Sequence, residues 1–176
     1  MTIAVYARST KDSNLTYIEQ IYNYLKSEKV DVIIHKPYYD FLKANYNFRL
    51  EIETYSNSEE LISKAFYLIC LGGDGTMLET ISLIKNSGIP VLGVNSGRLG
   101  FLASVNKDDL EKALEEILKE KFTLDKRELI KISGCNNCFG DVNYALNEFT
   151  IHKKDSSSMI NIDTYVDGVF LNSYFA

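Results

Sequence analysis

The sequence predicts an α/β fold in two parts. A parallel-sheet domain is expected over residues 1–120, followed over residues 121–176 by the start of an all-β sandwich domain. Short apolar runs alternate with segments of helical spacing as far as residue 94, which is typical of βαβ units. A glycine-rich stretch follows one of those runs directly. From Phe122 onward the spacing becomes that of strands joined by turns.

Four apolar runs are predicted to be the strands of the parallel sheet, at residues 2–7, 30–35, 66–71 and 90–94. Helical spacing predicts helices that begin near residues 14, 37, 58 and 76, and a further one over 107–119. Residues 45–58 carry a weak signal and are expected to contain a loop. Ligands of such a Rossmann-like sheet bind at the carboxyl ends of the strands, so we expect the site at that edge.

The second part of the chain is predicted to contain strands over Tyr144–His152 and Met159–Phe175, with a turn at Asp167-Gly168. A β-domain of so few strands would have open edges and a thin core. We therefore expect a fragment of a longer protein, or a fold whose missing strands come from elsewhere. Open edges also predict self-association into a homo-oligomer.

The composition excludes several classes of function. With 19 basic and 24 acidic residues the net charge is −5, so no nucleic-acid partner is expected. No apolar run approaches the roughly 20 residues that cross a bilayer, and the N-terminus lacks the features of a signal peptide. We expect a cytoplasmic protein without a membrane partner.

The three cysteines are odd in number and come without a secretion signal, which argues against a disulfide framework. Cys135 and Cys138 have zinc-ligand spacing, but no second Cys or His pair follows. A hairpin turn built on the two asparagines between them is the favoured alternative. Cys70 lies in an apolar run and is expected to be a small core residue.

The stretch Gly72-Gly73-Asp74-Gly75-Thr76 stands between a predicted buried strand and a predicted helix. Such a junction presents free N–H groups and the positive end of the helix dipole to an anion. A carboxylate would repel phosphate there, so Asp74 suggests work on a hydroxyl or a metal. A second glycine-rich segment, Asn95 to Gly100, leaves the sheet at the same edge. The P-loop, the dinucleotide-binding fingerprint, the nucleophile elbow and the zinc-protease motif are all absent from the sequence.

These residues resemble a known family. The Gly72–Thr76 motif is shared by NAD kinases, diacylglycerol and sphingosine kinases and, in modified form, 6-phosphofructokinases. Asn95–Leu102 resembles the Asn-x-Gly-x-Leu-Gly-Phe segment of NAD kinases, whereas the Gly-Thr-x-Asn-Asp segment of the lipid kinases is absent. Ala145–Glu148 resembles the Asn-Glu motif of NAD kinases. Together the three motifs select the NAD kinases over the whole chain.

The resemblance implies phosphoryl transfer from ATP, with Mg²⁺, to the 2′-hydroxyl of the adenosine ribose of NAD. Asp74 would accept the hydroxyl proton as the P–O bond forms. The N–H groups of Gly72, Gly73 and Gly75, with Thr76, would hold phosphoryl oxygens or the NAD diphosphate. The resemblance further implies that Asn147 and Glu148 bind NAD and that Phe101 lies near the adenine pocket.

Each of these residues has a second interpretation. Asp74 fits a turn without catalytic work, Phe101 fits packing as well as stacking, and the pair Asn147-Glu148 fits an exposed strand edge. Arg98 fits a phosphate, a surface or a subunit contact. His35 is interpreted as structural.

Two other functions remain open: a lipid or sugar kinase of the same wider group, and a nucleotide-binding fragment without catalysis. The family pattern continues beyond the position of Ala176 with motifs that supply much of the NAD and ATP site. The activity of the 176-residue chain by itself is therefore open.

Overall fold

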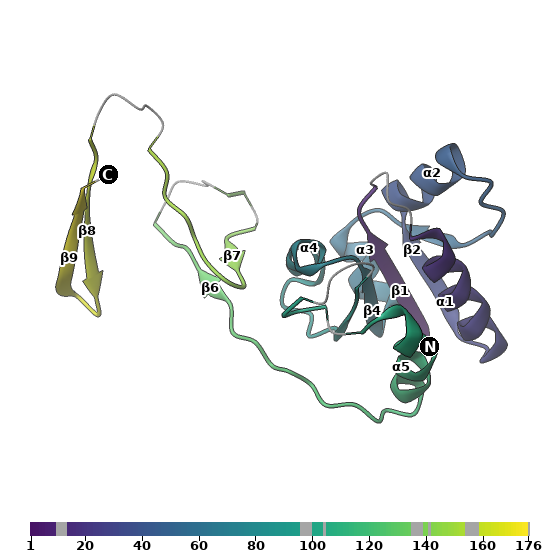
Figure 1. The fold of residues 1–176 in the computed structure, drawn as a ribbon. Helices are drawn as coiled ribbons and strands as arrows, with labels where there is room; N and C mark the ends of the chain where they lie inside the picture. The colour runs from purple at the N-terminus through teal and green to yellow at the C-terminus, as the bar shows by residue number, and fades with distance from the viewer. Residues whose placement is uncertain are drawn as a thin grey trace. The chain divides into compact units, whose positions relative to one another are not determined.

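The computed structural model describes residues 1–9, 14–95, 100–103, 105–134, 139–140, 142–153 and 159–175 (Figure 1). The chain divides into two compact units, Met1–Leu146 and Asn147–Ala176. The division predicted near residue 120 stays a prediction. Among the described residues, no helix has the length and apolar character required to cross a membrane.

The first unit is built on a five-stranded parallel sheet with the order β3-β2-β1-β4-β5. Its strands are β1 (Thr2–Ala7), β2 (Asp31–His35), β3 (Glu53–Tyr55), β4 (Tyr67–Leu71) and β5 (Val91–Val94). The predicted α/β class and parallel sheet are confirmed. The region 45–58 contains the expected loop at residues 46–52, but the sequence prediction missed β3, which adds a parallel edge strand to β2. Three residues are too few to show a strand period, and Tyr55 is fully buried, with its hydroxyl donating to the Val5 carbonyl at 3.2 Å.

Helices cover both faces of this sheet: α1 (Leu15–Ser27), α2 (Lys36–Asn45), α3 (Ser58–Lys64), α4 (Asp74–Ile84) and α5 (Leu110–Leu118). Alternate residues of β1 point to opposite faces, as a pleated strand requires. Ile3 and Val5 pack into the core that α1, α2 and α5 cover, and Ala4 and Tyr6 pack into the core under α3 and α4. Because both faces are buried, the central strands β1 and β4 are mostly apolar rather than alternating, whereas the edge strand β3 carries Glu53 and Thr54.

Local sequence explains where the helices begin. Asn57 caps α3: its side-chain oxygen accepts the N–H of Glu60 at 2.9 Å, and the Glu60 carboxylate accepts the N–H of Ser56 at 2.8 Å. This reciprocal pair satisfies two N–H groups at the helix start. Pro37 lies in the first turn of α2, where its missing N–H costs nothing.

After α5 the first unit contains one short antiparallel pair, β6 (Ile130–Lys131) and β7 (Tyr144–Ala145). The strand predicted over Tyr144–His152 is therefore too long, since only its first two residues pair with a neighbour. Among the described residues, no strand lies opposite residues 147–152 to continue the ladder.

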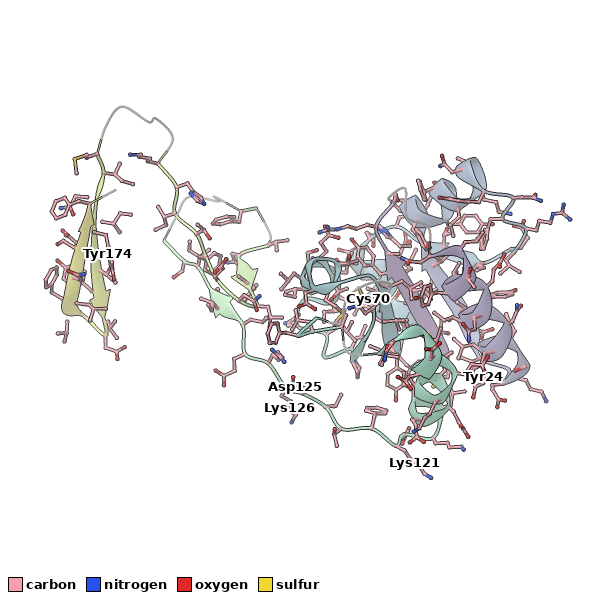
Figure 2. All side chains as sticks on the ribbon, in the orientation of Figure 1. Tyr24, Cys70, Lys121, Asp125, Lys126 and Tyr174 are labelled. Carbon is pink, nitrogen blue, oxygen red and sulfur yellow. The ribbon has the colours of Figure 1, made fainter. Side chains whose placement is uncertain are left out.

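The second unit is a hairpin of β8 (Asn161–Val166) and β9 (Val169–Phe175). The predicted turn is confirmed: Asp167 and Gly168 have φ of 51° and 81°, and two successive positive φ values match the twist of a hairpin. Most of its apolar side chains are exposed, including Val169 at 70% and Tyr174, which is labelled on the hairpin in Figure 2. An isolated two-stranded sheet is marginally stable at best.

Candidate functional site

The strand order places the topological switch point of the sheet between β1 and β4. The chain leaves β1 toward β2 on one side, whereas β4 leads to β5 on the other, so the order reverses between β1 and β4. At such a point the loops after the two strands separate and leave a crevice at their carboxyl ends. The predicted glycine stretch follows β4 directly, as expected. The Asn14 side chain supports this edge by donating to the carbonyl of Leu71 at 3.3 Å.

Gly72 and Thr76 shape the glycine loop from within. Gly72 has a φ of 154°, and a Cβ at this position would lie 2.5 Å from the Thr76 hydroxyl oxygen. Its N–H donates to the Val94 carbonyl at 2.9 Å, and the N–H of Thr76 donates to the Gly73 carbonyl at 2.9 Å. Thr76 is buried. The N–H groups of both residues therefore form hydrogen bonds within the protein that hold the loop in place.

Gly73 and Gly75 present the N–H groups that remain. Gly73 is the N-cap of α4 and Gly75 lies in its first turn, where a helix provides no acceptor of its own. No backbone carbonyl of the described residues accepts either N–H group. A Cβ on Gly73 would meet nothing within 4 Å, so the loop surface above it is open. This is the arrangement that suits an anion at a helix N-terminus.

Asp74 is the first residue of α4, and its carboxylate accepts three backbone N–H groups from the segment after β5. Oδ2 accepts from Phe101 at 2.8 Å, while Oδ1 accepts from Leu102 at 2.9 Å and from Ala103 at 3.1 Å. The N–H groups of Leu102, Phe101 and Ala103 hold the pKa of the Asp74 carboxyl below its ordinary value, because they stabilise the ionised form. The carboxylate is therefore ionised at neutral pH.

The segment after β5 returns close to that strand. Val105 pairs with Val94, and the N–H of Asn95 donates to the Val105 carbonyl at 2.7 Å. The Phe101 side chain is 94% exposed, so its ring makes no core packing and is free to meet a ligand. Residues 96–99, which include Arg98, lie outside the described residues.

A polar clamp formed by Tyr6, Arg8 and Glu79 lies beside the glycine loop and was not predicted from the sequence. Glu79 of α4 accepts from the Tyr6 hydroxyl at 2.8 Å and pairs with Arg8 at 2.7 Å, and Arg8 also donates to the Gly75 carbonyl at 3.1 Å. The end of β1 is thereby fastened to the first turns of α4. The hydrogen bond from Arg8 lowers the pKa of Glu79, with a smaller contribution from Tyr6. The sequence signal that could have indicated this clamp is the change from apolar residues to Tyr6 and Arg8 at the end of β1.

Two other residues of this sheet that the sequence analysis considered, His35 and Cys70, have structural surroundings. His35 lies between the rings of Tyr6 and Tyr55, with centroids 5.1 and 5.5 Å away, and its burial lowers the pKa of the imidazole. Cys70 is fully buried in the sheet (Figure 2), and burial raises the pKa of its thiol to about 12. A thiol that stays protonated at neutral pH is a poor nucleophile.

The remaining predicted residues belong to the second unit or lie outside the described residues. Asn147 and Glu148 are exposed residues at the start of the second unit. Cys135 and Cys138 lie outside the described residues. Within the described ranges, no group of three or more His, Cys, Asp or Glu side chains gathers as a metal cage would require.

Known proteins share both the sequence and the fold. Residues 3–122 match the ATP-NAD kinase N-terminal domain family. The chain is 38% identical to the NAD kinase of Cytophaga hutchinsonii and 37% identical to that of Flavobacterium psychrophilum. Both alignments cover 100% of this chain and 60% of the relative, so the chain spans about three fifths of the length of these relatives.

Among solved structures, yeast NADH kinase complexed with NADH has a TM-score of 0.76 at 22% identity, which shows a shared fold; the match covers 98% of this chain and 54% of that one. An NAD kinase from Archaeoglobus fulgidus in complex with ATP has a TM-score of 0.70 at 25% identity, with 98% and 57% covered. The family match extends over more than half of the sequence and includes the glycine loop, Asp74 and the segment that holds its carboxylate. The chain therefore belongs to the NAD kinase family.

Proposed function

We propose that the protein to which this chain belongs transfers a phosphoryl group from ATP to the 2′-hydroxyl of the adenosine ribose of NAD, which makes NADP. The observation that carries the proposal is that an ionised Asp74 carboxylate lies at the same helix start as the N–H groups of Gly73 and Gly75, which no backbone carbonyl of the described residues accepts. The carboxylate can accept a hydroxyl proton, and the N–H groups beside it can donate to phosphoryl oxygens.

In this mechanism the glycine loop, Gly72 to Thr76, positions the phosphoryl oxygens. The N–H groups of Gly73 and Gly75 donate to them, and Gly72 and Thr76 fix the backbone that aims those groups. The hydroxyl oxygen attacks the terminal phosphorus, and the bond to the leaving ADP oxygen breaks with its electron pair on that oxygen. Asp74 takes the hydroxyl proton.

Divalent Mg²⁺ would neutralise charge on the transferred group. The described residues offer no three-ligand protein cage, and the Asp74 oxygens are engaged by N–H groups. This donor set fits an ion that is held mainly by the nucleotide phosphates and by water, as Mg²⁺ commonly is.

The comparisons support the choice of substrates. The relatives that align over the whole chain are named NAD kinases, and the archaeal structural neighbour is a complex with ATP. Binding of NAD by Phe101, Asn147 and Glu148 is part of the proposal, supported for Phe101 by its exposed ring. The proposal also includes a cytoplasmic homo-oligomer, for which the exposed apolar side chains of β8 and β9 are the support.

The test uses the full-length protein with NAD, ATP and Mg²⁺, with the product identified by mass spectrometry and by its acceptance in a NADP-specific dehydrogenase assay. Formation of 2′-phosphorylated NAD is expected. No NADP, together with turnover of a diacylglycerol, a sphingoid base or a hexose phosphate, would replace this function with the lipid or sugar kinase alternative. Calorimetric binding of NAD without any turnover would make it a nucleotide-binding protein.

A further inference from the structure

The three N–H groups on Asp74 are distributed unequally between its two oxygens. Oδ1 accepts two of them, from Leu102 and Ala103, and Oδ2 accepts one, from Phe101. An ionised carboxylate has about four acceptor positions, two on each oxygen. Counting only the contacts made by the described residues, Oδ1 is therefore saturated and one position remains on Oδ2.

Two glycines let the segment Gly100–Ala103 reach this carboxylate. A Cβ on Gly100 would lie 2.2 Å from Oδ1 and 2.7 Å from Oδ2 of Asp74. A Cβ on Gly93, in β5, would lie 2.7 Å from the Cα of Ala103. Neither distance is tolerated between real atoms, so the segment fits between β5 and Asp74 only because both side chains are absent. Ala103 is fully buried in this position.

We propose that the backbone of Gly100–Ala103 is the positioning element of the reaction: it commits Oδ1 of Asp74 to the fold and leaves Oδ2 as the oxygen that meets the substrate hydroxyl. This inference rests on the proposed function and deepens it. Gly100 acts through Asp74 and is a positioning residue. A hydroxyl that donates to the remaining position of Oδ2 has its own lone pairs directed away from the carboxylate, toward the phosphorus.

The order of bond changes follows from the same contacts. Three N–H donors make Asp74 a weak base, so it accepts a hydrogen bond from the hydroxyl before it accepts the proton. In a loose transition state the bond from phosphorus to the ADP oxygen is largely broken before the new bond forms, and the hydroxyl becomes acidic only then. The proton passes to Oδ2 at that stage and leaves to water afterward, which restores the carboxylate.

A positive charge near the carboxylate also lowers the pKa of Asp74. Besides the N–H groups, the guanidinium of Arg127 is the charged group of the described residues that lowers the pKa of Asp74. Gly100→Ala should remove N–H contacts and leave Arg127 in place. The pKa of Asp74 should then rise toward the ordinary aspartate value, and the acid limb of kcat should move to higher pH with it.

The first measurement is made on the unchanged protein at neutral pH. NMR couplings across hydrogen bonds should connect the carboxyl carbon of Asp74 to the amide nitrogens of Leu102 and Ala103. Absence of both couplings, with the resonances assigned, overturns the inference without any variant or activity assay. The measurement is independent of whether the protein makes NADP, so its failure is distinct from failure of the proposed function.

The second measurement compares Gly100→Ala with Gly88→Ala in the full-length protein. Gly88 has a φ of 75° and nothing within 4 Å of a Cβ, so its substitution strains the backbone away from Asp74. Gly100→Ala should lower kcat by about 10²-fold or more with KM for NAD within about threefold, whereas Gly88→Ala should leave kcat and its pH profile unchanged. Equal kcat values, or an unmoved acid limb in Gly100→Ala, would overturn the positioning role.

Discussion

The parallel sheet of the first unit and the β8–β9 hairpin of the second differ in how much of their apolar surface the chain itself covers. Leu68 in β4 is fully buried, whereas Val169 in β9 is 70% exposed. The sheet is enclosed by helices on both faces and carries a site geometry that its own residues define. In the hairpin, β8 and β9 pair only with each other among the described residues, and they are joined by a well-formed turn. The difference teaches that the chemistry of Asp74 and the contribution of the second unit are separable by experiment.

The largest expected effect separates chemistry from binding. Asp74→Asn in the full-length protein should lower kcat by about 10²- to 10⁴-fold, because the proton acceptor is lost and an NH₂ group replaces an oxygen that accepts N–H. Glu148→Gln should instead raise KM for NAD by about tenfold, the size of one lost hydrogen bond. Steady-state kinetics with NAD as the varied substrate measure both.

Asp40→Asn is the matched control for the first variant, since Asp40 pairs with Lys36 on α2 at 3.0 Å. Its kcat should equal that of the unchanged protein. Turnover retained by Asp74→Asn would remove the general-base role, and a kcat effect of Glu148→Gln as large as that of Asp74→Asn would break the separation between the two units.

The next effect concerns stability. Leu68→Ala should cost about 2–5 kcal/mol in the free energy of unfolding, since it leaves a cavity in a closed core. Val169→Ala should change it by no more than about 0.5 kcal/mol in the 176-residue chain. Urea unfolding followed by circular dichroism measures both. A cost above about 1 kcal/mol for Val169→Ala in the full-length protein would show that other residues cover the hairpin there.

How much of this could be read from the sequence depends on the element. The apolar runs of β1, β2, β4 and β5 and the Asp167-Gly168 turn were predictable, because burial on both faces and positive φ each leave a local pattern. The three-residue strand β3 was missed since its ladder depends on β2. Likewise, sequence identified Asp74 but not its partners, because backbone N–H groups carry no residue signature. The Tyr6–Glu79 contact joins residues 73 positions apart and follows no period.

A third prediction tests the glycine loop as part of the self-contained sheet. Gly72→Ala should cost about 2–4 kcal/mol of folding free energy, since the new Cβ would meet the Thr76 hydroxyl in a strained backbone region. Gly73→Ala should cost at most about 1 kcal/mol, because its Cβ meets nothing and an N-cap only moderately favours glycine. Thermal unfolding of the pair measures the contrast, and equal costs would contradict the close approach of Gly72 and Thr76.

The smallest effect is a pH dependence of the clamp. Because Arg8 lowers the pKa of Glu79 below its ordinary value of 4.5, the pair stabilises the fold above about pH 4.5 and loses that contribution as the pH falls through the folded-state value. Both side chains are partly exposed, so the contribution is below about 1 kcal/mol. Glu79→Gln should therefore lose less stability than the unchanged protein between pH 7 and pH 3.5.

Tyr6→Phe is the control for that comparison, since it keeps the Arg8–Glu79 pair and should keep its acid-dependent loss. If Glu79→Gln and the unchanged protein lose stability in parallel on acidification, the clamp contributes nothing measurable to the sheet.

The position of β1 in the middle of the sheet has a consequence for how the protein is made. One edge of β1 pairs with β2, which ends at His35, but its other edge pairs with β4, which is complete only at Leu71. At roughly 5–20 residues per second, a ribosome needs roughly 2 to 7 s to add those intervening residues. During that time the nascent chain exposes the unpaired edge of a mostly apolar strand, which is a template for wrong pairing. The same long-range pairing that sets the switch point between β1 and β4 therefore makes this stretch of synthesis the period in which a chaperone has most to protect.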